Sequence, residues 1–316
     1  MGMSSGYPIG AQFAASLREE NKCSKIEGER LLAFTNTSGP LFIIGAVGIG
    51  MFANSQIGFL LLITHFIAAL IVGILFRFYK NTTCERMKIF ENSNKNKHSN
   101  SVNLSNIGTI MGDAIRKSIS TLLLICGFIV FFCVLGTILD SSGITAQISN
   151  IISKLFVWLG FSENIIGTLS AGCFKGILEI TNGLKILSNS NMDFKVLLPI
   201  CATILGFGGI SVHMQVASII SSSDLSIKPY LLGKTLHGLF SGILTYLILN
   251  HTKFVNLETV ETFSNSTLQD LNNTNILNLF GSGNLLLIAL ACIVLVLLIK
   301  LLFSKSTYIT KKDSEF

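Results

Sequence analysis

The stretch Thr35-Asn36-Thr37-Ser38-Gly39-Pro40 interrupts an apolar segment that runs from about residue 30 to residue 52. A second apolar segment, from about residue 196 to 221, is interrupted in the same way by Gly206-Phe207-Gly208-Gly209. A bilayer offers no partners for backbone polar groups, so a break at membrane depth is costly unless it lines a cavity or binds a ligand. A matched pair of broken helices is the best sequence indication of a transporter's substrate site.

The composition predicts an all-α polytopic membrane protein. The chain has 316 residues, of which 50% are hydrophobic and only 13% are charged, whereas soluble domains carry about 25% charged residues. A bilayer requires runs of about 20 apolar residues, and four uninterrupted runs reach that length, at 57–78, 118–139, 230–250 and 284–303. With the two broken helices, this predicts six crossings.

The distribution of charge predicts the orientation. Lys and Arg are dense in residues 77–117 and in the tail after residue 300, whereas residues 250–283 hold a single lysine and three carboxylates. Under the positive-inside rule, residues 79–117 and the C-terminus are cytoplasmic and residues 250–283 are external. Because the basic residues alternate with spans, the net charge of +6 is not interpreted as a nucleic-acid-binding face. The seven cysteines are scattered without a CxxC pair, so no metal site or disulfide framework is predicted.

This orientation makes the two broken helices run in opposite directions, which is an inverted repeat. Gly6 and Gly39 are 33 residues apart, and so are Gly176 and Gly209. The first copy starts at a hairpin tip, and a lone half-hairpin leaves backbone groups unsatisfied. We therefore expect the protein to have a further N-terminal portion with the other hairpin arm and several spans.

The predicted organisation has six parts. They are a first repeat (1–80), a cytoplasmic polar loop (81–117), a connecting span with an amphipathic helix at 144–159 (118–162), a second inverted repeat that begins with a re-entrant hairpin (163–250), an external polar loop (251–283), and a final span with a basic tail (284–316).

Glu179 is the most informative single residue. A carboxylate inside an apolar hairpin is costly, so a functional role is the default hypothesis. A tip residue that reaches external water is the alternative. Thr181 and Asn182 beside it offer hydrogen-bond donors and acceptors to a substrate, or cap the returning arm of the hairpin.

The first break supplies three further candidates for substrate binding. Unwound carbonyls and hydroxyls at Asn36, Thr37 and Ser38 suit a polar substrate group, or a Na⁺ ion near Thr37 and Ser38. The alternative is a kink induced by Pro40 and repaired by local side chains.

The second break supplies four candidates. Gly208 and Gly209 let the backbone open and let a ligand approach, or else allow close helix packing. Ser211 and His213 follow them. A neutral histidine can hydrogen-bond and a cationic one can attract an anion, whereas the alternative is a satisfied buried histidine.

Lys175, in the re-entrant hairpin, could neutralise an anionic substrate, or extend to the membrane surface.

Three motifs resemble a known family. Ser5-Gly6-Tyr7-Pro8-Ile9-Gly10-Ala11, the stretch from Thr35 to Gly45, and Lys175-Gly176-Ile177-Leu178-Glu179-Ile180-Thr181-Asn182-Gly183 resemble the YlbJ (SpoVV) sporulation integral membrane proteins of endospore-forming bacteria. The resemblance implies a nucleoside-recognition gate domain and an architecture similar to the concentrative nucleoside transporters. In that architecture a glutamate of the second hairpin faces the substrate, and Glu179 is the matching position. The resemblance also implies transport of dipicolinic acid across the outer forespore membrane and, by analogy, a homotrimer.

The leading hypothesis is a secondary transporter with alternating access, which needs the lipid bilayer, a small-molecule substrate, no cofactor, and Na⁺ or H⁺ as coupling ion. A nucleoside or another small solute is the alternative substrate. An enzyme is not expected, because no HExxH or GxSxG motif is present. A membrane scaffold of a spore-envelope assembly is the remaining alternative, although a scaffold has no evident need for paired broken helices.

Overall fold

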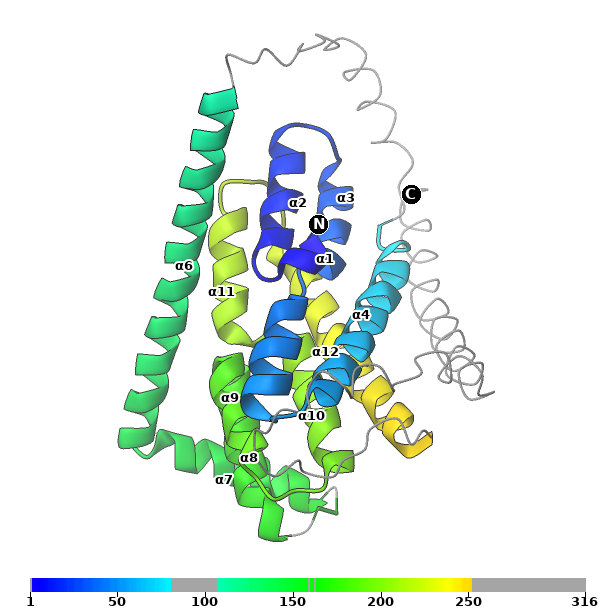
Figure 1. Cartoon of the computed structure of the whole chain (residues 1–316), viewed down its shortest axis with the longest axis vertical. Helices are drawn as coiled ribbons and strands as arrows, with labels where there is room; N and C mark the ends of the chain where they lie inside the picture. The colour runs from blue at the N-terminus through cyan, green and yellow to red at the C-terminus, as the bar shows by residue number, and fades with distance from the viewer. Residues whose placement is uncertain (1, 81–106, 159, 162, 252–316) are drawn as a thin grey trace, which may run out of the picture.

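The computed structural model describes residues 2–80, 107–158, 160–161 and 163–251, and this part of the chain folds into helices without a strand (Figure 1). The helices are α1 (Gly2–Ser5), α2 (Ile9–Glu19), α3 (Lys25–Thr35), the π-helix η1 (Leu41–Met51), α4 (Ser55–Phe76), α6 (Ile107–Ser141), α7 (Ile144–Trp158), α8 (Glu163–Leu178), α9 (Ile180–Ser188), α10 (Phe194–Phe207), α11 (Gly209–Ile220) and α12 (Ile227–His251). The predicted span at 284–303, the external loop after residue 251 and most of the cytoplasmic loop lie outside the described residues.

Four described segments are long and apolar enough to cross a membrane. They are α4, residues 108–141 of α6, the α10–α11 segment (194–220), and α12. The predicted spans at 57–78, 118–139 and 230–250 thus correspond to α4, α6 and α12, and the predicted amphipathic helix is α7. Helix α6 begins at Ile107, however, so residues 107–117, which were predicted to be part of a polar loop, are helical. The expectation of an all-α polytopic membrane protein is confirmed.

Both predicted breaks are present. The first broken segment consists of α3, an irregular stretch from Asn36 to Gly39, and η1, which starts after Pro40. Proline has no N–H to donate and favours the first turn of a helix, so Pro40 starts a new helix and does not extend α3. In the second segment, Gly208 separates α10 from α11 with φ of +94°, a conformation that glycine adopts without a Cβ clash.

The two halves of the chain have matching hairpins at opposite ends. In Figure 1, α2 and α3 lie in the upper part of the molecule and α8 and α9 in the lower part, so the broken segments α3–η1 and α10–α11 run in opposite directions. Helix α2 contacts α11, and α9 contacts η1. Each hairpin therefore packs on the second half of the other repeat's broken helix.

The equal glycine spacings correspond to equal contacts. A Cβ added to Gly6 would lie 3.1 Å from the amide nitrogen of Gly39, and a Cβ added to Gly209 would lie 3.1 Å from the carbonyl oxygen of Gly176. In each half, the hairpin tip therefore approaches its own break at backbone distance. These paired contacts support the inverted repeat.

Helices α10, α12 and α4 form the centre. A Cβ on Gly206 would lie 2.6 Å from Cα of Gly238, so α10 and α12 touch through their backbones. In contrast, α6 lies along the left side of Figure 1, and only 11% of its most apolar 18-residue stretch is buried. Large side chains such as Leu122 and Leu123 are exposed there. An exposed apolar face of this kind is what a helix in contact with lipid presents.

Candidate functional site

The two breaks meet at Lys234, a fully buried lysine of α12. Its ammonium Nζ donates to the phenol oxygen of Tyr7 at 2.8 Å, to the carbonyl oxygen of Asn36 at 3.3 Å and to Nδ1 of His237 at 3.0 Å. A Cβ on Gly208 would lie 3.5 Å from Cε of Lys234 and 3.2 Å from the phenol oxygen of Tyr7. The first hairpin tip, both breaks and α12 therefore share one centre, which we call the break junction.

Backbone partners fix the hydrogen-bond roles of two histidines beside the lysine. His237 Nε2–H donates to the carbonyl oxygen of His65 at 2.9 Å, which leaves Nδ1 of His237 free to accept from Lys234. The amide N–H of Ser38 donates to Nε2 of His65 at 3.1 Å. The two rings lie 4.3 Å apart between centroids. Helix α4 is thereby joined to the first break and to α12.

A second set of polar groups surrounds the buried phenol of Tyr230. The Asn36 amide Nδ2 donates to the Tyr230 oxygen at 3.3 Å, and that hydroxyl lies 3.3 Å from Nδ1 of His213. Asn36 Oδ1, His65 Nδ1 and His213 Nε2 are buried and hydrogen-bond to none of the described residues. Buried polar atoms are nearly always satisfied, so such a cluster suits a polar ligand.

The break junction holds a buried lysine whose hydrogen-bond partners are all neutral. Among the residues that the structure describes, no carboxylate forms an ion pair with Lys234, whereas the other well-buried lysine, Lys175, is paired with Asp140 at 2.6 Å. Removing an ammonium from water costs several kcal/mol, by order of magnitude, unless a counter-charge or good hydrogen bonds compensate it. Lys234 relies on hydrogen bonds alone.

Glu179 caps helix α9. Its Oε1 accepts from the Thr181 amide at 3.0 Å and its Oε2 accepts from the Asn182 amide at 2.9 Å, so both carboxylate oxygens are engaged. Thr181 and Asn182 thus serve the cap with their backbones, and Glu179 itself is the capping side chain. The tip lies against the second break, because a Cβ on Gly209 would be 3.1 Å from the Gly176 carbonyl oxygen.

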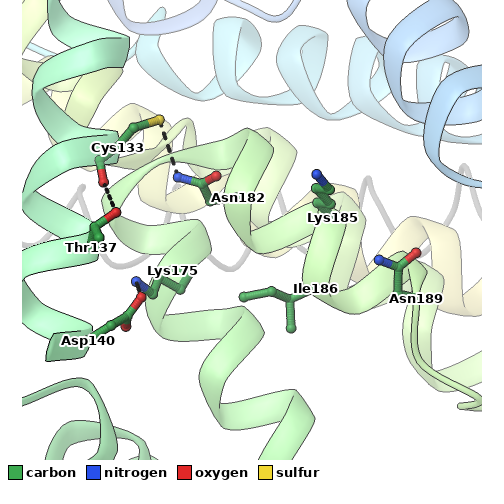
Figure 2. A pocket seen from close by; sticks show the side chains of 8 residues that line it. All are labelled: Cys133, Thr137, Asp140, Lys175, Asn182, Lys185, Ile186 and Asn189. Atoms are coloured by element: carbon green, nitrogen blue, oxygen red, sulfur yellow. Dashed lines mark hydrogen bonds and ion pairs between the residues drawn. The ribbon is translucent and has the colours of Figure 1, made fainter. Parts of the chain in front are cut away.

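Asn182 extends into a different space, which we call the hairpin cavity (Figure 2). This cavity of about 340 Å³ is lined by Cys133, Thr137, Asp140, Lys175, Asn182, Lys185, Ile186 and Asn189. The amide of Asn182 donates to the sulfur of Cys133 at 3.4 Å, and Lys175 donates to Asp140. Two lysines and one aspartate give the lining a formal charge of +1. The hairpin tip therefore touches the second break but contributes Asn182 to a cavity beside α6.

The remaining predicted site residues are also buried near the breaks. Thr37 donates to the carbonyl oxygen of Met3 at 3.4 Å, and Ser211 accepts from Gln215 at 3.5 Å. Arg30 of α3, by contrast, lies away from the breaks and donates to the carbonyl oxygen of Tyr79, which follows the end of α4. Among the described residues, no cluster of three or more His, Cys, Asp or Glu could hold a metal ion.

Sequence reasoning missed the residues at the centre of the junction. These are Tyr7, Tyr230, Lys234 and His237, together with the acceptor role of His65. A usable signal was present, because an ionisable residue inside a span is a functional-site candidate by default. Lys234 and His237, in the span predicted at 230–250, are ionisable residues of this kind just as Glu179 is.

The fold and site define an all-α polytopic membrane protein in which two broken helices of opposite direction meet at a buried lysine. Over 257 residues the chain is 34% identical to the sporulation integral membrane protein YlbJ of Bacillus subtilis (strain 168), covering 78% of this chain and 62% of that relative. The chain belongs to the YlbJ family, as its motifs predicted, and it is an integral membrane protein. It spans less than two thirds of the relative's length. Neither protein-family models nor solved structures give a match.

Proposed function

We propose that this protein is a secondary transporter of a small anionic solute, and that its two halves move relative to each other about the break junction. The observation that carries the proposal is the meeting of both breaks at fully buried Lys234. Broken helices expose backbone groups that can bind solute or ion at mid-membrane, and rigid halves can rock about such a point. A scaffold has no need for a buried lysine without a counter-charge, because removing its ammonium from water is costly.

We propose dipicolinate as the solute. Three considerations support it: membership of the YlbJ family, the similarity to a relative known as a sporulation protein, and the chemistry of the hairpin cavity. Lys175, Lys185 and Asn182 offer cationic and amide donors to a carboxylate, with Asp140 as the only acid in the lining. The volume of about 340 Å³ lies within the range of small-molecule sites. A nucleoside remains the alternative substrate.

Counterflow in proteoliposomes tests this function. The full-length protein is reconstituted into vesicles loaded with unlabelled dipicolinate, and exchange with external radiolabelled dipicolinate is followed. We expect labelled dipicolinate to enter protein-containing vesicles and not protein-free ones, and excess uridine not to compete. Uridine exchange without dipicolinate exchange would replace the substrate, and exchange of neither would refute the transporter proposal.

A further inference from the structure

We propose that the Lys234 ammonium takes the place of a coupling sodium ion at the first break, so that solute movement is coupled to protons. The inference rests on the proposed transport function and specifies its driving ion. The sequence predicts that the unwound carbonyls and hydroxyls of the first break could hold Na⁺. In the structure, a break carbonyl that could serve a cation, that of Asn36, accepts from Lys234.

The bonding of the ammonium resembles that of a small bound cation. Nζ has three N–H bonds, and three neutral acceptors receive them: a phenol oxygen, a backbone carbonyl oxygen and an imidazole nitrogen. The acceptors come from the first hairpin tip, the first break and α12. Lys234 is therefore saturated in this conformation, and a solute carboxylate would have to displace one of these partners to bind it directly. This favours a coupling role over direct substrate binding.

The surroundings determine what happens when the junction opens. The titratable groups that face Lys234 are Tyr7 from the hairpin tip, His65 from α4, His213 from α11, and Tyr230 and His237 from its own helix. None of them is a carboxylate. The three hydrogen bonds are therefore what offsets the desolvation of the charge, and losing any of them leaves an incompletely solvated ammonium in a low-dielectric interior.

This arrangement links conformation to proton binding. Tyr7 belongs to the first hairpin and also lies against Gly208 of the second break. A movement of either hairpin or break that separates Tyr7 or Asn36 from Nζ removes an acceptor. The ammonium then releases one proton to water entering from the open side and becomes a neutral amine. Reprotonation from water on the other side restores the three bonds and closes the junction, so one proton crosses per cycle.

The test compares driving forces in proteoliposomes of the full-length protein, with radiolabelled dipicolinate as probe. A pH gradient is imposed in either direction in sodium-free buffer, or a Na⁺ gradient at equal pH, and an entrapped pH-sensitive dye follows protons. We expect accumulation against a concentration gradient with a pH gradient of one direction, proton movement on dipicolinate addition, and no accumulation with Na⁺.

The Lys234→Gln variant locates the coupling group. We expect it to lose accumulation driven by the pH gradient at least 10-fold, and this loss to exceed any loss of counterflow, because counterflow needs no net proton movement. Lys228→Gln, an exposed lysine on the same helix, is the matched control and should accumulate like the wild type. Lys234→Met tests the same charge loss with an apolar chain.

Each result discriminates. Accumulation driven by Na⁺, or a Lys234→Gln protein that still accumulates with the pH gradient, would overturn the coupling inference and leave the transporter proposal intact. Absence of counterflow by the wild type would instead refute the transporter proposal, and the coupling inference with it. If both Lys234 variants fail to fold, the ion dependence and the dye signal of the wild type still test the inference. Accumulation of dipicolinate without proton movement would overturn it.

Discussion

Removing one hydroxyl group measures how strongly the hairpin tip holds the buried lysine. Tyr7→Phe deletes the acceptor that lies 2.8 Å from Lys234 Nζ and the donor that lies 3.3 Å from the Leu205 carbonyl oxygen. The ring itself, whose centroid is 4.9 Å from Nζ, stays in place, so the cation–π contact is retained. Hydrogen bonds to charged groups contribute about 1.5–3 kcal/mol, but those between membrane helices average only about 0.6 kcal/mol.

From these two magnitudes we expect Tyr7→Phe to lower the free energy of unfolding by about 1.5 kcal/mol. This is the lower end of the range for a charged partner, because other partners replace part of the hydrogen bond in the unfolded state. That loss is slightly more than a tenfold change in the unfolding equilibrium. Unfolding by increasing mole fractions of SDS in mixed micelles, followed by circular dichroism, measures it. Tyr246→Phe, an exposed tyrosine on α12, is the control and should change stability by less than about 0.5 kcal/mol. Equal stability of the two variants would refute the role of Tyr7.

Three further predictions follow from single contacts. Gly208→Ala should destabilise the protein by about 1–2 kcal/mol through its positive φ and slow counterflow, whereas Gly112→Ala, where a Cβ meets nothing within 4 Å, should do neither. Glu179→Gln keeps one acceptor for the α9 cap and loses the other, so it should cost about 1 kcal/mol in SDS unfolding and reduce counterflow; an unchanged protein would remove Glu179 from both roles. Arg18 lowers the pKa of Asp224 chiefly by hydrogen bonding, and this exposed pair should add at most about 1 kcal/mol to the free energy of unfolding. That stabilisation is present above the unfolded pKa of about 3.9 and is lost as the pH falls through the lower native pKa. Arg18→Gln should abolish this part of the pH dependence of unfolding.

The architecture could be predicted from the sequence because its determinants are local. Apolar runs of spanning length and the signals at Pro40 and Gly208 act on the chain within one or two turns, so α4, α12 and both breaks followed directly. The equal 33-residue spacings indicated the repeat, but they did not predict that Gly6 lies against Gly39 and Gly176 against Gly209.

The candidate site was predictable only in part, because its partners are distant in sequence. Asn36 and Gly208 were expected near the site and do lie at the break junction. Lys234, which joins the junction, lies 198 positions from Asn36 and 227 positions from Tyr7 in the sequence. No local sequence pattern encodes such contacts. For Asn182, the sequence showed that it lies beside Glu179. It did not show where the side chain points, because that direction depends on a contact with Cys133 of α6.

The two repeats match in backbone but differ in the charge at their hairpin tips, and this difference makes the break junction asymmetric. Both tips approach their own breaks through glycines. The first tip supplies Tyr7, which reaches across to the second break and binds Lys234, whereas the second tip supplies Glu179, whose two oxygens are used by its own helix. The carboxylate thus stabilises the second hairpin locally and leaves the lysine without a counter-ion among the described residues.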